Sequence, residues 1–292
     1  MRVWLISLLL MPLFQVGAGE ADVTRQLSRS WDFGIGIGYG EQSNPFIAAD
    51  DVPGLVTLDL AIYGDRFFFD NGELGYTLMD RPDFGVNLLA TYSSERIYYS
   101  YFNELGLFRN SGLGFRPGSD EVVVVPAEQL PAAGVSTGPP GQFGILELPD
   151  RSFALNLGVE LLWNWSWGQL QWQVLQDVSG AHQGLETDLT FSKSWHSGRW
   201  AFKPSVGISW QSAKLVDYYY GVNNRDQLFE LVYAGEATTH VTVGMLVSYR
   251  INNRLSYVTR FSHTQLGSAV RNSPLIDADH TQAYFSGLFY RF

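Results

Sequence analysis

Residues 153–167 read FALNLGVELLWNWSW, and the side chains alternate in character along the whole stretch. The odd positions, from Phe153 to Trp167, carry large apolar or aromatic groups, whereas the even positions carry mainly small or polar ones such as Asn156 and Glu160. A period of two predicts a β-strand with one apolar and one polar face. The stretch exceeds the usual strand of about five or six residues and reaches the roughly ten tilted residues that cross a bilayer.

The same alternation recurs at 31–39, 200–210 and 241–251. Such strands build either a soluble sandwich with the apolar face inward or a membrane barrel with that face outward. Polar-face residues distinguish the two, because a dry core excludes them and a lumen accepts them. The charged residues of this kind that we assign to the lumen are Glu160, Lys203 and Arg250.

The tryptophans also favour the barrel. Trp165, Trp167, Trp195 and Trp200 lie beside predicted tight turns, where indoles form a girdle at the membrane interface. A sandwich would bury tryptophan in the middle of a strand. We therefore predict an all-β fold, a transmembrane antiparallel up-and-down barrel with short periplasmic turns and longer outer loops.

The number of strands follows from the short turns. Five of them, at 64–65, 94–95, 167–168, 196–198 and 252–253, are what a barrel of twelve strands needs on its periplasmic side, with ten strands as the alternative. The strands are expected at about 31–40, 55–63, 66–78, 83–94, 96–108, 152–166, 169–177, 183–195, 199–213, 236–251, 254–263 and 281–292. The longest connection, at about 109–151, holds six of the twelve prolines and is predicted to be an outer loop.

The N-terminus predicts export. Arg2, an apolar run at 3–14 and small residues at 16–18 form a signal peptide, predicted as 1–18, with one barrel domain at 19–292. The chain has no cysteine, which excludes disulfides and cysteine-based zinc sites. Its net charge of −10 argues against a nucleic-acid partner.

Two segments carry a resemblance to a known family. Residues 55–102, which contain GDRFFFDNGELGY at 64–76, resemble the MipA/OmpV family of outer-membrane proteins, and so do residues 217–222, which are Asp217, Tyr218, Tyr219, Tyr220, Gly221 and Val222. The aromatic C-terminal strand, ending in Tyr290 and Phe292, resembles the signal read by the outer-membrane insertion machinery. On the residues themselves, the three tyrosines of 217–222 are expected to end a strand at the outer girdle, with Gly221 supplying the turn.

The resemblance also implies a location and a role. It implies a Gram-negative outer-membrane barrel in contact with lipid and lipopolysaccharide, without established catalytic residues. It further implies a scaffold that brings a murein-cleaving lytic transglycosylase together with a murein synthase, or a surface adhesin.

One group of residues in the outer loops is a candidate for catalysis. Asp50 and Asp51 on one loop, with Asp277, Asp279 and His280 on another, could activate water if the loops meet. Acidic surface loops often contain such groups by chance, and we expect neither an enzyme nor a cofactor.

The five histidines, His182, His196, His240, His263 and His280, are too scattered in the sequence to predict a metal site. Three functions remain open: a murein-linked scaffold, a small-solute channel through the polar lumen, and an adhesin acting through the loop at 109–151.

Overall fold

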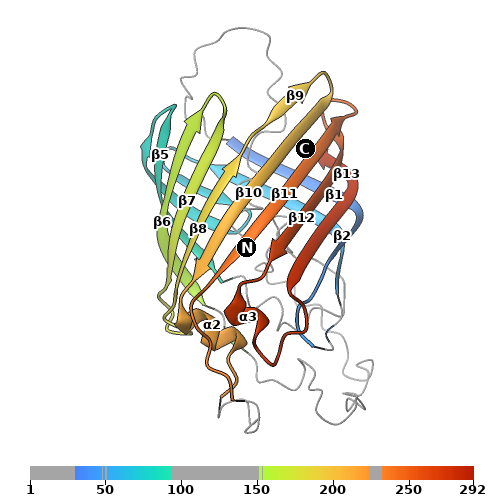
Figure 1. The fold of residues 1–292 in the computed structure, drawn as a ribbon. Coiled ribbons are helices and arrows are strands. Elements are labelled where there is room, and N and C mark those ends of the chain that lie inside the picture. The colour runs from blue at the N-terminus through green and yellow to red at the C-terminus, as the bar shows by residue number, and fades with distance from the viewer. Residues whose placement is uncertain (1–29, 48, 50, 94–150, 153, 224–231) are drawn as a thin grey trace, which may run out of the picture.

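The computed structural model describes residues 30–93, 151–223 and 232–292, apart from 48, 50 and 153. These residues form an antiparallel β-barrel with two short helices at one end (Figure 1). The predicted signal peptide and most of the predicted long loop lie outside the described residues. The elements are β1 (Ser30–Gln42), β2 (Val52–Tyr63), β3 (Phe67–Asp70), β4 (Glu73–Asp80), β5 (Phe84–Tyr92), β6 (Leu155–Trp165), β7 (Gly168–Asp177), β8 (Leu185–Ser192), β9 (Trp195–Ser197), β10 (Trp200–Gln211), α2 (Ala213–Tyr220), β11 (Thr238–Arg250), β12 (Leu255–Gln265), α3 (Ser268–Arg271) and β13 (His280–Arg291).

The sheet closes on itself. Each strand pairs with its neighbours in the sequence, β13 pairs with β1, and β10 pairs with β11. Because β8 and β9 both pair with β10, they are two parts of one strand, and the wall has twelve strands. The predicted fold class and the count of twelve, rather than ten, are confirmed.

The route to twelve strands differs from the prediction in one region. The strand predicted at 66–78 is two strands, β3 and β4, because Asn71 and Gly72 form a tight turn with φ of 45° and 92°. Asparagine and glycine are the residues that tolerate this left-handed backbone. The strand predicted at 96–108 and the turn predicted at 94–95 lie outside the described residues, whereas β5 pairs directly with β6 and the fifth short turn is at 81–83.

The two faces of the wall have opposite character. On β6, Leu157 and Val159 are exposed outward while Asn156 and Glu160 are buried inward. On β1, the inward position of Gly34 is covered by the ring of Phe289 from β13, which would lie 2.2 Å from a Cβ placed there. Outward apolar and inward polar faces are what a bilayer-spanning barrel requires.

None of the described helices is long and apolar enough to cross a membrane.

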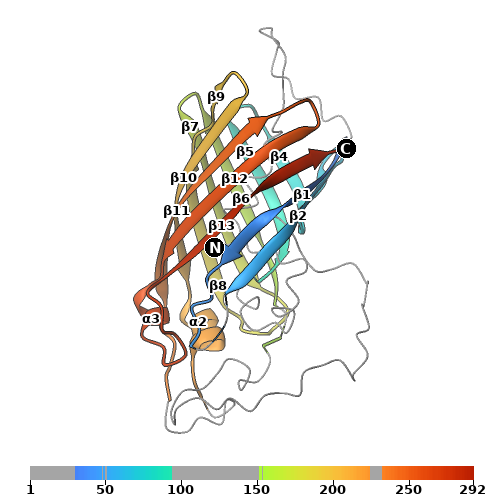
Figure 2. The ribbon, with the colours of Figure 1, turned by 90° about the vertical axis from the view of Figure 1, so that its right-hand side faces the viewer.

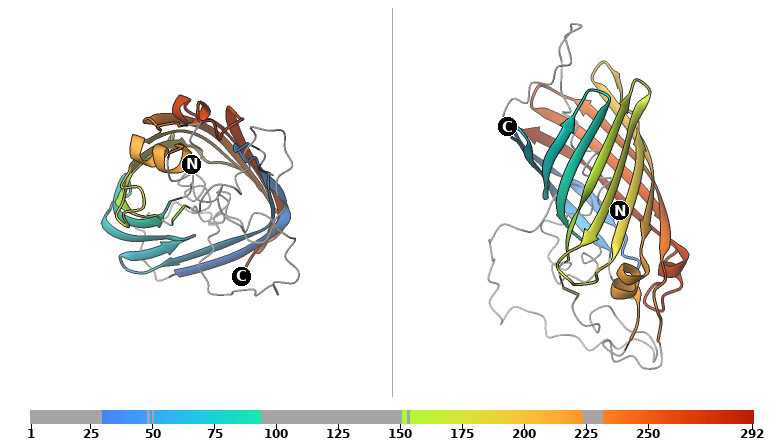
Figure 3. Two further views of the ribbon diagram at one scale, coloured as in Figure 1. Left: turned by 90° about the horizontal axis from the view of Figure 1, so that it is seen from below. Right: turned by 90° about the vertical axis from the view of Figure 1, so that its left-hand side faces the viewer.

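The two ends of the barrel are unlike. Short turns at 64–66, 81–83, 166–167, 198–199 and 251–254 lie at one end, together with the C-terminus (Figure 2). The other end carries α2, α3 and the longer connections. Seen from that end, α2 lies within the outline of the barrel and α3 lies at its rim (Figure 3). Since short turns face the periplasm in outer-membrane barrels, the helices lie at the outer mouth.

Candidate functional site

Buried charges on the inner face are segregated between two walls. The acidic ones come from β2 to β8, and are Asp59, Asp70, Glu73, Glu160, Asp177, Glu186 and Asp188. The basic ones on the described strands are Lys203 on β10 and Arg260 on β12. The two walls therefore have opposite charge. At the short-turn end Arg291 reaches Asp59 with an Nη2 to Oδ2 distance of 3.7 Å.

Glu160 on the inner face is held by three side-chain amides. Its carboxylate accepts hydrogen bonds from Asn87 Nδ2 at 2.8 Å and from Gln173 Nε2 at 2.7 Å, and a third from Gln171 Nε2. Three amide donors from β5 and β7 hold the carboxylate of β6, so this network ties three strands together. Lys203 is buried as well, whereas Arg250 is half-buried at the last position of β11.

A second acidic group lies where β2 meets the β3–β4 turn. Tyr63 Oη donates to Asp70 at 2.5 Å, and Asn71 Nδ2 donates to Asp59 at 2.7 Å and to Asp70 at 3.0 Å. The Asn71 side-chain oxygen also accepts from the Leu60 backbone N–H at 2.9 Å. These bonds explain why this turn holds Asn71 in a left-handed conformation.

The family-like segment 217–222 does not end a strand, so the expected girdle position of its tyrosines is wrong. Its first four residues close the helix α2, in which Leu215, Val216, Tyr219 and Tyr220 are buried. Their spacing of one, four and five residues is that of a single helical face, and this pattern competes with a period of two. Gly221 follows the helix in an extended conformation.

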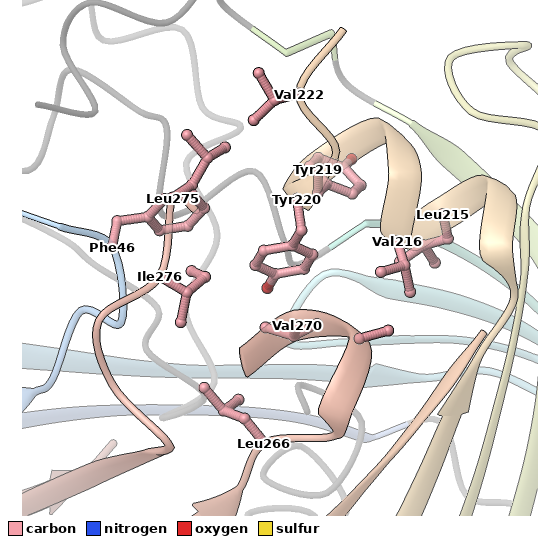
Figure 4. Close-up of a cluster of buried hydrophobic side chains, with 11 residues drawn as sticks. Phe46, Leu215, Val216, Tyr219, Tyr220, Val222, Leu266, Val270, Leu275 and Ile276 are labelled. Carbon is pink, nitrogen blue, oxygen red and sulfur yellow. The ribbon is translucent and has the colours of Figure 1, made fainter. Parts of the chain in front are cut away.

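The buried face of α2 belongs to an apolar cluster that we call the outer cap (Figure 4). Its buried members are Phe46, Leu215, Val216, Tyr219, Tyr220, Val222, Leu266, Ala269, Val270, Leu275 and Ile276. They come from the β1–β2 connection, from α2 and the chain directly after it, and from the β12–β13 connection with α3. Tyr220 lies between the two helices and stacks on Phe46, with ring centroids 5.6 Å apart.

Polar contacts extend the outer cap to two further connections. The Tyr218 hydroxyl accepts a hydrogen bond from the Ser152 backbone N–H at 2.7 Å, before β6. The His182 ring, between β7 and β8, lies 5.7 Å from the Tyr219 ring. Ser273 Oγ donates to the Tyr220 carbonyl at 2.6 Å. Segment 217–222 thus contacts every longer connection that the structure describes at this end.

Asp217 fixes the position of α2 through two glycines. Its Oδ1 accepts from the Gly235 backbone N–H at 2.9 Å, and its carbonyl accepts from the Gly221 N–H at 3.0 Å. A Cβ at Gly235 would lie 2.4 Å from the Asp217 nitrogen, and one at Gly221 would lie 2.3 Å from its carbonyl oxygen. Glycine at both positions is therefore a steric requirement of the outer cap.

The two loops of the catalytic hypothesis do meet, but through their backbones. Ile47 N–H donates to the Leu275 carbonyl at 2.9 Å, and Asp277 N–H donates to the Pro45 carbonyl at 3.1 Å. Asp51 Oδ1 instead accepts from the Asn44 N–H of its own loop, at 2.9 Å.

Asp279 likewise bonds within its own segment. Its carboxylate lies 2.5 Å from Nδ1 of His280, and this hydrogen bond lowers the pKa of Asp279. Asp50 lies outside the described residues. The carboxylates of Asp51 and Asp279 therefore bond within their own loops rather than with each other.

Two of the five histidines, His263 and His280, lie next to each other. His263 and His280 have ring centroids 4.9 Å apart at the outer ends of β12 and β13. His240 is buried and lies 3.2 Å from Gln211 Oε1, and His196 is exposed at the opposite end. Within the described residues no three histidine, aspartate or glutamate side chains are arranged to hold a metal.

Comparison with protein families decides the classification. A family model described as MltA-interacting protein MipA matches residues 33–292. The chain belongs to the MipA family. The match extends from the beginning of β1 to the C-terminus, so it covers the barrel wall and the outer cap together.

Curated relatives of this MipA-family chain are named outer-membrane proteins or MltA-interacting proteins. Omp26La of Vibrio anguillarum is 28% identical over 35% of this chain and 40% of its own length. The MltA-interacting protein of Escherichia coli K12 is 22% identical over 52% of this chain and 62% of its own, and OmpV of Vibrio cholerae is 24% identical over 58% and 66%. The chain thus spans 40% to 66% of the length of these relatives. The predicted outer-membrane location is confirmed.

Solved outer-membrane structures also align with the MipA-family chain. The NanC porin is 9% identical with a TM-score of 0.39, covering 89% of this chain and 98% of that one. An outer-membrane channel from Pseudomonas putida F1 is 10% identical with a TM-score of 0.36, covering 94% and 100%.

The remaining predicted residues lie at the short-turn end. Trp165, Trp167, Trp195 and Trp200 are all exposed there, and the rings of Trp165 and Trp167 stack with centroids 4.9 Å apart. Tyr290 and Phe292 are exposed and have centroids 5.0 Å apart. Their roles as girdle and insertion signal stay predictions.

Arg260 and most of the buried acidic residues were not among the lumen residues predicted from the sequence. Alternation along 255–265 was the available signal, because it places Arg260 on the same face as Ser256, Ser262 and Thr264. All four of these side chains are buried.

Proposed function

We propose that this MipA-family barrel is a non-enzymatic scaffold that docks a murein lytic transglycosylase, and through it a murein synthase, at its periplasmic end. The support is the family membership together with the name of a relative, which states an interaction with MltA. On this chain, the exposed β9–β10 hairpin supports the proposal, because it lies at the short-turn end (Figure 1).

The hairpin offers a protruding polar surface. His196, Ser197 and Arg199 are exposed, and Gly198 turns the chain with a φ of 60°. The neighbouring turn between β11 and β12 adds exposed Arg254. A stable interface buries about 800 Å² on each partner, so the partner must contact several of these turns at once.

Site-specific crosslinking in cells tests the docking end. A photoreactive amino acid at His196 or Arg254 is expected to crosslink a lytic transglycosylase. The same group at Lys214, exposed on α2 at the opposite end, is the control and should give no such product. Recovery of only the insertion machinery and lipopolysaccharide from the turn positions would contradict the scaffold.

Substitution of the same surface gives a second measurement. The double variant His196→Ala, Arg199→Ala should reduce copurification of the transglycosylase several-fold without changing the amount of folded barrel. The matched outer variant Lys214→Ala, Arg271→Ala changes two exposed side chains at the mouth and should leave copurification unchanged.

We further propose that the four exposed tryptophans contact lipid headgroups and that Tyr290 and Phe292 are read by the insertion machinery. Indole rings are stable at the boundary between hydrocarbon and headgroups. Phe292→Ala should lower the fraction of protein inserted in the outer membrane, measured by heat-modifiable migration on gels. Tyr257→Ala, which truncates another exposed aromatic on the outer face of the wall, is the control.

A small-solute channel is the second candidate, and the oppositely charged inner walls favour it. Conductance in planar bilayers tests it directly. A silent bilayer at high protein load would remove this candidate. The adhesin hypothesis depends on a loop outside the described residues and stays a prediction.

A further inference from the structure

Arg260 is a buried cation without a hydrogen-bonding partner in the described part of the chain. Its side chain is 3% exposed on the inner face of β12, and Nε, Nη1 and Nη2 have no hydrogen-bond partner among the residues that the structure describes. The residues paired with it on the adjacent strands are Leu246 and Phe285, both buried and apolar. No acceptor is therefore supplied by the neighbouring strands.

Lys203 brings a second positive charge to the same row. The register pairs Lys203 with Leu246 and Leu246 with Arg260, so the two cations lie two strands apart on one level of the barrel. At a spacing of about 4.8 Å per strand, their backbones are roughly 10 Å apart. Both side chains are long enough to reach one group held over Leu246.

The acids of the inner face lie on other strands. Buried carboxylates belong to β2 through β8, and Glu160 among them is already held by three amides. Arg260 itself forms no ion pair in the described part of the chain. A guanidinium out of water without a counter-charge is unfavourable, so a partner from outside the chain would stabilise it.

We propose that Arg260, assisted by Lys203, forms an anion-binding site in the lumen that takes the carboxylate or phosphate group of a small solute. The planar guanidinium can donate two parallel hydrogen bonds to either group, and the ammonium adds a point charge. Leu246 and Phe285 keep competing protein acceptors away. Both side chains lie on the inner face of the barrel wall, whereas the proposed scaffold uses exposed residues of the periplasmic turns, so the site does not depend on that function.

Calorimetric titration of the full-length folded protein in detergent micelles tests the site. Inorganic phosphate and acetate are titrated separately at constant ionic strength, and the tighter of the two identifies the preferred group. Arg260→Met should weaken binding at least ten-fold, and Lys203→Met should weaken it by a smaller factor. Arg271→Met, which removes an exposed arginine of the same charge at the outer mouth, should leave binding unchanged. Absence of binding by the wild type, or equal binding by Arg260→Met, would overturn the proposal.

Unfolding by urea in lipid vesicles provides an independent readout. Without added phosphate or acetate, Arg260→Met should raise the unfolding midpoint, because it removes a buried charge that lacks a counter-charge. The anion that binds should raise the midpoint of the wild type and of Arg271→Met but not that of Arg260→Met. A midpoint of Arg260→Met below that of the wild type in anion-free buffer would mean that the chain itself satisfies the guanidinium, and the site would be rejected.

Discussion

The outer cap and the lumen of this barrel have opposite interiors. The cap buries Phe46, Tyr219 and Tyr220 in an apolar cluster outside the expected bilayer, whereas the wall buries Glu160 and Arg260 at its inner face. The cap is bathed by water and is therefore held by the hydrophobic effect, like the core of a soluble protein. The wall places most of its apolar side chains in lipid, so its inner face depends mainly on hydrogen bonds such as those of Glu160. The same chain thus buries mainly apolar side chains in the outer cap and mainly polar side chains on the inner face of the wall.

Removing Tyr220 from the outer cap should have the largest effect. Tyr220→Ala deletes a 3% exposed ring that stacks on Phe46, and truncation of a buried aromatic costs about 3–5 kcal/mol. We expect amide hydrogen exchange in α2 and α3 to accelerate strongly while the barrel strands remain protected.

Faster exchange in the two helices alone would show that the outer cap opens independently of the barrel wall. Lys214→Ala, on the exposed face of the same helix, is the control and should leave exchange unchanged. If Tyr220→Ala accelerated exchange equally in β6 and β7, cap and wall would be one cooperative unit rather than two.

The hydrogen-bond network of the lumen is the next target. Glu160→Gln keeps the shape but replaces a carboxylate that accepts from three amides by a group that must present its own donors to them. Charge-assisted hydrogen bonds contribute about 1.5–3 kcal/mol each, and we expect a loss of that order in total. Urea unfolding in lipid vesicles measures it, with Asp65→Asn at an exposed turn as the control for lost negative charge. A neutral result would mean that the wall does not rely on this network.

The inner face of the wall is closely packed at β1, where the ring of Phe289 covers Gly34. Gly34→Ala would place a Cβ 2.2 Å from the ring of Phe289, and overpacking of this kind costs about 1–3 kcal/mol. Gly85→Ala is the matched control, because its Cβ would lie 3.5 Å from Leu162, an ordinary contact. The double variant with Phe289→Leu should regain part of the loss in the same urea titration; equal effects of the two glycine variants would contradict the ring contact.

The barrel wall and the outer cap also differ in how far the sequence predicts them. The wall was predictable, because most strands repeat a period of two and the lipid face requires it. The Asn71–Gly72 turn inside 66–78 was missed even though the polar run 70–73 interrupts the apolar pattern and Asn-Gly is a strong signal of a two-residue hairpin. The outer cap was not predictable in this way. Its members come from separate connections, and the helical spacing from Leu215 to Tyr220 covers too few residues to stand out beside the long strand before it.

The smallest effect is expected from the exposed pair Asp279 and His280 at the rim of the mouth. The hydrogen bond from His280 lowers the pKa of the Asp279 carboxyl, so its contribution to stability is present above the ordinary pKa of aspartate and is lost as the pH falls through the lowered value. Both side chains are exposed, and solvent and salt weaken such pairs. Asp279→Asn should therefore shift the urea midpoint far less than Glu160→Gln at neutral pH, and the difference from wild type should vanish in acid or high salt. A shift as large as that of Glu160→Gln, persisting in high salt, would place Asp279 in a buried network with the outer cap and would reopen the catalytic hypothesis for these loops.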